Sequence, residues 1–233
     1  MRLFCFPYAG GAAHLFHGWS NMLPQDVEVC AVNLPGRAQR MQERPYRRLA
    51  RLVDDACEGL RPDLDRPFAL FGHSMGALIA FEAARCLRAK YGAQPVHLFV
   101  SGRRPPQLSN STSQIHNLAD NEFLDELKRM GGAPTEIFGY SDVMELMAPV
   151  IRADFEMVET YLYYEGEKLS CPITALGGMD DPDIPPDCLE QWGIHTTANF
   201  SMHWFPGDHF FIHSARRFVL GCLAAELNFL RKA

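Results

Sequence analysis

The stretch FALFGHSMGALIAFEAA, residues 68–84, decides the fold. Its apolar start, residues 68–71, predicts a buried strand, and the apolar spacing of residues 77–84 predicts a helix directly after it. Between them, Gly72-His73-Ser74-Met75-Gly76 fits the G-x-S-x-G pattern of a nucleophile elbow. In so tight a turn, a side chain at either glycine would collide with neighbouring backbone. We therefore expect Ser74 at a strained, exposed apex beside a helix N-terminus, rather than in an ordinary glycine-bearing turn.

Composition limits the class of protein. The chain has 233 residues, of which 47% are hydrophobic and 21% charged, which is typical of a soluble globular domain with a sizeable core. The net charge of −6 argues against nucleic acid as the main partner. The seven scattered cysteines form no CxxC pair, which indicates reduced thiols in a cytoplasmic protein. We expect no signal peptide, no membrane span, no metal site among the nine dispersed histidines, and no cofactor.

Short apolar runs alternate with helical patterns along the chain. This alternation predicts an α/β protein with a mostly parallel central sheet flanked by helices. The expected strands are Leu3–Phe6, Val27–Asn33, Pro67–Phe71, His97–Ser101, Ile173–Gly177 and His203–Phe205. The expected helices of the core are Ala13–Met22, Arg48–Leu60, Met75–Lys90, Asp187–Thr196 and His213–Leu230.

Residues 109–165 interrupt this rhythm because their pattern is helical throughout. Glycine and proline punctuate the segment at residues 131–134, and Pro149 can kink its second helix. We interpret it as a helical lid inserted over the carboxyl edge of the sheet. Residues 1–108 and 166–233 then form the α/β core.

A nucleophilic serine needs a histidine base, and the base needs an orienting acid. In α/β-hydrolases these residues follow in the order serine, acid, histidine. His209 lies after the last expected strand, in the loop FPGDHFFIH. His213 is its rival but lies at the start of the last helix, and His203 has a strand pattern that favours a structural role. We therefore expect His209 to be the base.

The acid should follow the strand ITALGG, where GGMDDPDIPP offers three aspartates. Asp181 is favoured because it precedes Pro-x-Ile-Pro, and Asp180 stays as the alternative, with Asp183 the third aspartate of the loop. Aspartates in such loops are usually caps or turn formers, so Asp181 is favoured by its place in the order serine, acid, histidine. Asp208, next to the expected base, is interpreted as a turn residue.

Acyl transfer also needs two N–H donors for the oxyanion. The amide of Met75, directly after the nucleophile, should be one. The other should come from the loop FPYAGGAA, whose glycine pair permits close backbone approach, with Tyr8 the first choice and Ala9 the alternative. On its own this loop would be no more than a glycine turn.

Taken in order, eight segments resemble the signatures of type II thioesterases, the discrete α/β-hydrolases that accompany polyketide and nonribosomal peptide synthases. They are FPYAGGAA, LPGRAQR, GHSMGALIAFE, LFVSGRRPP, LKRMGGAP, PVIRADFEMVETY, CPITALGGMDDP and PGDHFFI, and they cover nearly the whole chain. The resemblance implies hydrolysis of stalled or aberrant acyl groups from the phosphopantetheine thiol of carrier proteins. It also implies Ser74 as nucleophile, His209 as base and Asp181 as acid.

Two departures from this family pattern stand out. The AGG loop begins at the seventh residue, where family members carry a longer N-terminal segment, so an edge strand is expected to be missing or the chain to start short. After LPGR the stretch RAQRMQERPYRRLARL is rich in arginine. Because carrier proteins are acidic near their attachment serine, Arg47 and Arg48 are candidate docking residues, against the simpler interpretation of a solvated helix face with Arg37 holding a loop.

The expected lid supplies candidates for an adaptable acyl pocket, although helical spacing alone also fits lid-to-core packing. They are Met130, Phe138, Met144, Met147, Phe155 and Met157. Arg152, Asp154 and Glu159 are expected to form a structural polar network. We expect a monomer whose partners are acyl or peptidyl carrier domains, with no nucleic acid and no membrane. The alternatives are a serine esterase or acyltransferase for small soluble esters, and an inactive hydrolase fold that only binds.

Overall fold

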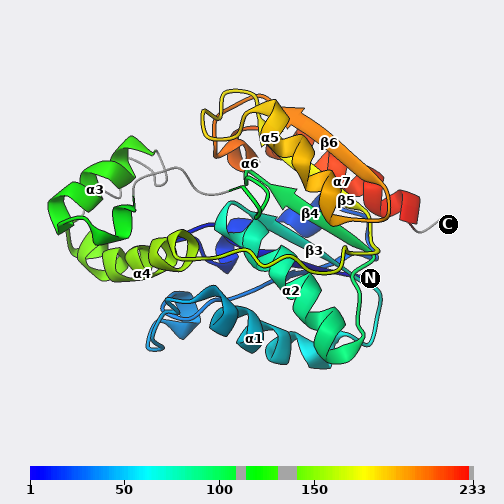
Figure 1. Ribbon diagram of the computed structural model, residues 1–233, viewed down its shortest axis with the longest axis horizontal. Helices are drawn as coiled ribbons and strands as arrows, with labels where there is room; N and C mark the ends of the chain where they lie inside the picture. Colours follow the sequence, from blue (N-terminus) through cyan, green and yellow to red (C-terminus); the bar gives the residue numbers. More distant parts are fainter. Residues whose placement is uncertain (109–113, 131–140, 231–233) are drawn as a thin grey trace.

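The computed structural model describes residues 1–108, 114–130 and 141–230 (Figure 1). Its centre is a six-stranded sheet of order β2-β1-β3-β4-β5-β6, in which every neighbouring pair is parallel. The strands are β1 (Arg2–Phe6), β2 (Glu28–Ala31), β3 (Phe68–His73), β4 (His97–Ser101), β5 (Ile173–Gly178) and β6 (Phe200–Phe205). The predicted α/β class is confirmed, and the sheet is all-parallel rather than mostly parallel.

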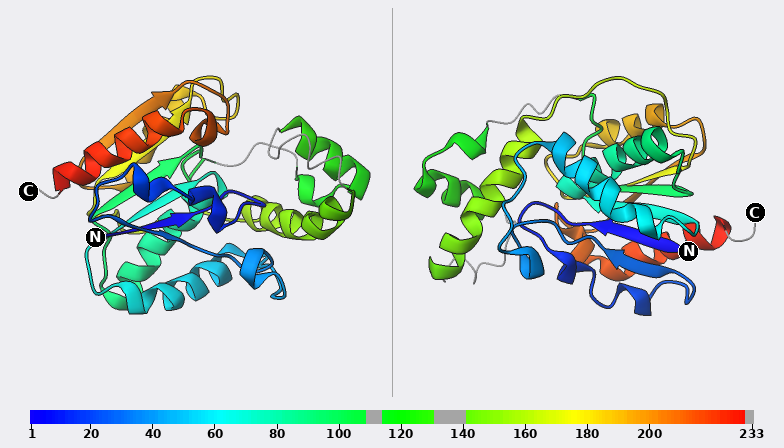
Figure 2. Two further views of the ribbon diagram at one scale, coloured as in Figure 1. Left: turned by 180° about the vertical axis from the view of Figure 1, so that it is seen from behind. Right: turned by 90° about the horizontal axis from the view of Figure 1, so that it is seen from below.

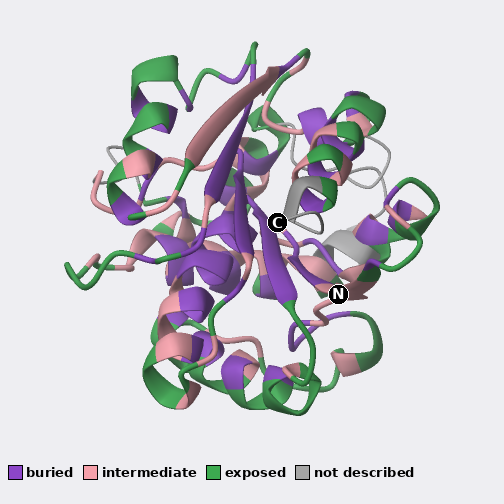
Figure 3. Cartoon of the chain, turned by 90° about the vertical axis from the view of Figure 1, so that its right-hand side faces the viewer, coloured by how far each residue is buried: buried purple, intermediate pink, exposed green. Residues whose placement is uncertain are grey.

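Helices cover both faces of the sheet, as Figures 1 and 3 show. The helices of the core are α1 (Leu49–Leu60), α2 (Met75–Tyr91), α5 (Pro186–Glu190), α6 (Phe211–Ser214) and α7 (Arg216–Leu230). Strand residues alternate between two hydrophobic cores: in β1, Phe4 and Phe6 face the core that contains α1, α2 and α5, whereas Leu3 and Cys5 face the core that contains α6 and α7. Both faces are buried, which explains why these strands read as continuous apolar runs.

Three predicted helices are shorter or more broken than their sequence pattern indicated. Ala13–Met22 is not one helix but two 3₁₀ turns, Ala13–Phe16 and Trp19–Asn21. Gly18 separates them with a φ of 73°, a left-handed conformation that no helix continues through. The predicted Asp187–Thr196 helix is α5 followed by the 3₁₀ helix Gln191–His195, and the last helix begins only at Arg216, after the separate turn α6.

Helices α3 (Asp120–Arg129) and α4 (Ser141–Glu159) stand beside the sheet rather than on one of its faces, and the strand arrowheads point toward them (Figure 2). A small separate cluster joins these helices to the 3₁₀ turn Ile115–Asn117, with Phe123 and Leu127 buried and Ile151 and Phe155 packed against them. Pro149 lies inside α4, at the position where the sequence predicted that a kink can form. The pair of helices therefore lies at the carboxyl edge of the sheet, where the loops after the strands converge.

No helix within the described ranges is long and apolar enough to cross a membrane. All seven cysteines are free thiols, and burial raises the pKa of several of them, including Cys5.

Candidate active site

The chain from β3 to α2 makes a sharp elbow with Ser74 at its apex. Ser74 has φ 54° and ψ −116°, and its amide donates to the Ser101 carbonyl oxygen at 2.7 Å, which fixes the elbow to the end of β4. A Cβ at Gly72 would lie 2.0 Å from the Gly76 carbonyl oxygen, and one at Gly76 would lie 2.1 Å from the Phe6 oxygen. Only glycine fits at these two positions, so the sequence pattern has the steric cause that it suggested.

Two loops at the same edge of the sheet bring an acid and a histidine to Ser74. His209, in the loop after β6, places Nε2 2.9 Å from Ser74 Oγ. Its Nδ1 lies 2.7 Å from Asp181 Oδ2, in the loop after β5. The Asp181 side chain is fully buried, while that of His209 is 24% exposed. These contacts form a continuous chain from a buried carboxylate to a partly accessible hydroxyl.

The choice between the neighbouring aspartates follows from the backbone. The Asp180 amide donates to the Gly207 oxygen at 3.0 Å, which ties the two loops together, and the Asp180 side chain is exposed. Asp181 turns inward, and its Oδ1 accepts the Asp183 amide at 3.0 Å. Asp208 accepts the Phe210 amide, the turn contact expected of it. The geometry therefore brings Asp181, and not Asp180, to His209.

A second serine–histidine contact lies beneath the first. His73 Nδ1 is 2.9 Å from Ser101 Oγ, and both residues are completely buried. Burial holds the pKa of His73 well below its usual range, so this ring stays neutral. Its centroid lies 5.3 Å from that of His209. This pair therefore has no access to solvent, and its imidazole packs against the ring of His209.

The rival histidine has a different partner. His213 Nε2 lies 3.1 Å from the hydroxyl of Tyr8 rather than near Ser74. Burial, together with Arg216 and His14, lowers the pKa of His213, while burial raises the pKa of Tyr8 to about 12. Tyr8 therefore keeps its proton, and its hydroxyl shares a hydrogen bond with Nε2 of His213. The Tyr8 ring also packs edge-on against His73 and Phe210, beside the contact to Ser74.

The two expected oxyanion donors lie on either side of the elbow. Met75 is the first residue of α2, so its amide has no acceptor within the helix. Tyr8 opens the turn Tyr8–Gly11, which is closed by the Gly11 amide donating to the Tyr8 oxygen at 2.9 Å. The close approach of Gly76 to Phe6 and Pro7 packs the elbow directly against the start of this loop.

A buried ion pair connects α4 to this same loop. The sequence did not indicate that this pair belongs to the site. Arg37, 2% exposed, makes a bidentate contact with Asp154, 1% exposed, and both N···O distances are 2.8 Å. Asp154 Oδ2 also accepts the Gly10 amide at 2.8 Å. The only signal in the sequence was the pair of motifs LPGR and RADF, in which these residues lie.

The other polar residues of α4 form contacts within the α3–α4 region. Glu159 accepts the amides of Ile115 and His116 and contacts the His116 ring. Arg152 donates to the oxygens of His116 and Leu118 and to Asp120. Of the network predicted for Arg152, Asp154 and Glu159, Arg152 and Glu159 are linked through His116, whereas Asp154 pairs with Arg37.

The predicted pocket residues of the α3–α4 region differ in their surroundings. Met130 is 39% exposed, Met147 is half-buried, and Phe155 packs edge-on against Phe123 with centroids 6.2 Å apart. Met157 is fully buried in the main core and lines the cavity between α1, α2 and the segment 160–167, which lies away from Ser74. Phe138 and the side chain of Met144 lie outside the described residues.

The arginine-rich stretch after β2 is largely paired. Arg47 and Arg48 both contact Glu156 of α4, at 2.5 and 2.8 Å, while their own side chains stay about 60% exposed. Arg40 pairs with Glu43. The two candidate docking residues therefore tether α4 to the start of α1 and still present part of their surface to solvent.

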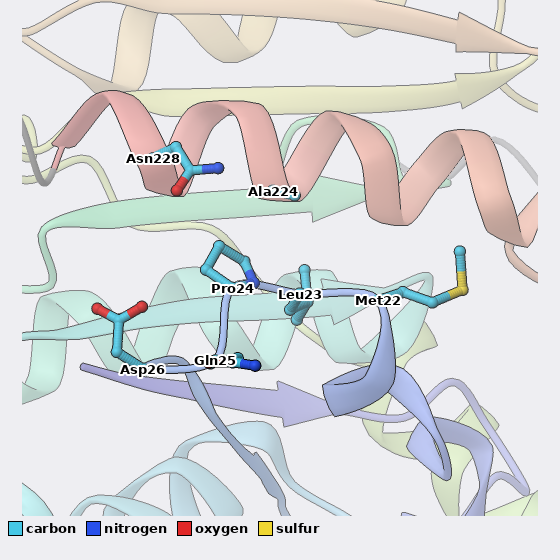
Figure 4. Close-up of a pocket in the computed structure, with 7 residues that line it drawn as sticks. All are labelled: Met22, Leu23, Pro24, Gln25, Asp26, Ala224 and Asn228. Atoms are coloured by element: carbon cyan, nitrogen blue, oxygen red, sulfur yellow. The ribbon is translucent and has the colours of Figure 1, made fainter.

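Two cavities lie away from Ser74. The first, of about 560 Å³, is an open hollow between the loop before β2 and α7 (Figure 4). It is lined by Met22, Leu23, Pro24, Gln25, Asp26, Ala224 and Asn228. The second, of about 760 Å³, lies between α1, α2 and the segment 160–167. Neither is lined by a residue of the Ser74 contacts, and in the described part of the chain no cluster of His, Cys, Asp or Glu has the arrangement of a metal site.

The chain is similar to a known protein family. The model of the thioesterase domain family matches residues 1–225. The chain is 45% identical over 229 residues to Linear gramicidin dehydrogenase LgrE of Brevibacillus parabrevis, covering 97% of this chain and 87% of that protein. It is 41% identical over 228 residues to Gramicidin S biosynthesis protein GrsT of Aneurinibacillus migulanus, covering 98% and 89%.

A solved structure agrees with the family match. The type II thioesterase BorB from the borrelidin biosynthetic cluster has a TM-score of 0.87 and 36% identity, with 97% of this chain and 91% of BorB covered. The chain therefore belongs to the thioesterase family of α/β-hydrolases. Within that family it is a type II thioesterase, an enzyme that hydrolyses thioesters.

Proposed function

We propose that this thioesterase removes aberrant or stalled acyl groups from the phosphopantetheine thiol of synthase carrier domains, through an acyl-enzyme on Ser74. One observation carries the mechanism: the unbroken chain of contacts from Asp181 through His209 to Ser74, at 2.7 and 2.9 Å. The carrier substrate is supported by the similarity to GrsT and BorB, which belong to biosynthetic pathways. We place the reaction in the cytoplasm, where such synthases and reduced thiols occur.

In the first half-reaction, Ser74 Oγ attacks the thioester carbonyl carbon while its proton passes to His209 Nε2. The buried carboxylate of Asp181 faces Nδ1 and stabilises the imidazolium that forms. The carbonyl oxygen becomes an oxyanion bound by the amides of Tyr8 and Met75. The C–S bond then breaks, and the thiol leaves with the proton from His209.

In the second half-reaction, water takes the place of the thiol. His209 accepts a proton from water as its oxygen attacks the acyl carbon, the same two amides bind the second oxyanion, and the C–O bond to Ser74 breaks. Ser74 regains its proton from His209. The products are the free acid and the carrier thiol, and no metal or cofactor takes part.

Residues 109–165 act in this scheme as a lid over the acyl group. Their described helices lie at the carboxyl edge of the sheet, beside the loops that carry Ser74 and His209. We assign Met130, Phe138, Met144, Met147 and Phe155 to an acyl pocket that adapts by repacking its methionines. Arg47 and Arg48 are the candidate contacts for an acidic carrier domain, because each is about 60% exposed.

The decisive experiment measures release of acetyl, propionyl and longer acyl groups from acyl-carrier protein. Ser74→Ala should abolish release, with a loss of about 10³-fold or more. Ser101→Ala is the matched control, because it removes the other hydroxyl that contacts a histidine. It should cost about 1–3 kcal/mol of stability by leaving His73 without its partner, while the rate stays within about threefold of wild type. Equal rates for wild type and Ser74→Ala would refute the mechanism.

The second candidate function, an esterase or acyltransferase for small soluble esters, needs the same three side chains. It predicts Ser74-dependent turnover of a nitrophenyl ester that exceeds turnover of the carrier thioester. The specificity constants for the two substrates, measured on one preparation, separate the candidates. LgrE bears the name of a dehydrogenase, but the contacts at Ser74 are those of acyl transfer.

A further inference from the structure

The oxyanion loop is held from α4 by a carboxylate, and this suggests a role for Asp154 beyond stability. We propose that Asp154 is a positioning residue for the thioesterase reaction: its carboxylate, fixed by Arg37, holds the Gly10 amide and so sets the turn that presents the Tyr8 amide to the oxyanion. The inference rests on the proposed function of Ser74 and Tyr8.

The contacts fix the loop on both of its sides. Asp154 Oδ2 accepts from the Gly10 amide at 2.8 Å, and Arg37 Nη1 donates to the Gly11 oxygen at 3.1 Å. The turn itself is closed by Gly11 N–H and the Tyr8 oxygen at 2.9 Å. With Gly10 and Gly11 held and the turn closed, the orientation of the peptide units back to Tyr8 has little remaining freedom.

The fit around Gly10 is too close for a loose tether. Gly10 has a φ of 74°, and a Cβ there would lie 2.9 Å from Cγ1 of Ile151 on α4. Ile151 is one turn before Asp154 on the same helix, so α4 contacts the loop through an apolar side chain and a carboxylate together. A displacement of α4 would therefore carry the Gly10 peptide with it.

The chemistry of the pair suits a fixed anchor. Both side chains are almost completely buried, and Arg37 is held further by the Pro35 oxygen at 3.3 Å. A bidentate guanidinium–carboxylate contact has a planar, defined geometry, and in a buried site it has no competing water. Replacing the pair by apolar residues would often be neutral for stability, so stability alone does not account for it.

Glu156 is a matched control on the same helix. It also ties α4 to the core through arginines, Arg47 and Arg48, but it touches no residue of the Tyr8–Gly11 turn. Both residues lose their charged tether when changed to alanine. Only Asp154→Ala removes an acceptor from the oxyanion loop, because asparagine would keep an oxygen for the Gly10 amide.

The test uses an acyl N-acetylcysteamine thioester, a small substrate without a carrier domain. Asp154→Ala should lower kcat by about 10- to 100-fold with KM within about threefold of wild type, since one misaligned donor affects only the transition state. Glu156→Ala should keep kcat within about twofold. Ser74 adds to the carbonyl of an acyl trifluoromethyl ketone and forms a bound oxyanion. The affinity for this inhibitor should therefore fall by the same factor as kcat. The affinity for the amide analogue of the thioester, which forms no oxyanion, should stay unchanged.

A second variant separates positioning from folding. Arg37→Met with Asp154→Leu removes both buried charges, so its stability in urea should exceed that of Arg37→Met alone, while kcat stays low because Gly10 still lacks its acceptor. Asp154→Ala that is folded and keeps kcat within about threefold overturns the proposal. So does an equal loss of affinity for both inhibitors, which would indicate general distortion of the site. A wild-type protein inert toward both this thioester and the acyl-carrier protein would instead overturn the proposed function itself.

Discussion

Replacing Asp181 with asparagine tests the catalytic chain of contacts by changing one atom. Asp181 Oδ2 faces His209 Nδ1, and Oδ1 accepts the Asp183 amide. Asparagine has a single oxygen, and the Asp183 amide needs it, so the NH₂ group must face Nδ1. The imidazole then carries its proton on Nε2, toward Ser74, and the serine hydroxyl has no acceptor. We expect kcat to fall by about 10⁴-fold, equivalent to about 5 kcal/mol of transition-state stabilisation.

The assay is thioester hydrolysis at pH 7.5, accompanied by the rate at which a fluorophosphonate labels Ser74. Both rates should fall, because both require the same proton acceptor. Asp180→Asn is the matched control: its side chain is exposed, and its structural contact is made by its backbone amide, which the change keeps. It should stay within about twofold of wild type. An Asp181→Asn variant that keeps a tenth or more of the wild-type rate would refute the tautomer argument.

Three further perturbations test other parts of the structure. Gly76→Ala places a Cβ 2.1 Å from the Phe6 oxygen and should cost more than about 4 kcal/mol or prevent folding, whereas Gly59→Ala, with nothing within 4 Å, should stabilise by about 0.5–1 kcal/mol in urea titrations. Arg47→Glu with Arg48→Glu should raise KM for an acyl-carrier protein several-fold and leave KM for the N-acetylcysteamine thioester unchanged; equal effects on both substrates would exclude docking. Burial lowers the pKa values of His97 and His195 to about 4, so both are neutral when folded. Because the unfolded chain binds these protons below a pKa of about 6.5, stability should fall between pH 6.5 and 4, by about 2 kcal/mol for each histidine at pH 5, and His97→Gln should reduce that slope in urea titrations at several pH values.

The sheet was predictable because its signal is local. The inner strands β1, β3, β4 and β5 are buried on both faces, so the apolar runs that end at Phe6, Phe71 and Ser101 stand out without knowledge of their neighbours. The parallel order then brings the loops after β1, β3, β5 and β6 to one edge. The positions of Ser74 and His209 at this edge follow from that order, since Ser74 comes directly after β3 and His209 lies in the loop after β6.

Contacts between distant segments were much harder to predict. Arg37 and Asp154 are 117 positions apart, and nothing in the local pattern of either distinguishes a buried ion pair from two solvated charges. The arginine-rich stretch was interpreted either as a docking surface around Arg47 and Arg48 or as a solvated helix face with Arg37 holding a loop. In the structure it divides: Arg37 is buried, and Arg47 and Arg48 share Glu156. A count of charges along the chain therefore overstates the positive surface offered to an acidic carrier domain.

The two serine–histidine contacts show what separates a catalytic pair from a structural one. Their distances, 2.9 Å in each case, do not distinguish them. The atom behind each imidazole does: Nδ1 of His209 faces a buried carboxylate, whereas Nδ1 of His73 faces only the Ser101 hydroxyl. A base must carry a positive charge during acyl transfer, and a hydroxyl cannot compensate that charge in a fully buried site. His73 therefore stays neutral beneath His209, and the G-x-S-x-G segment supplies both the proposed nucleophile and the support for its base.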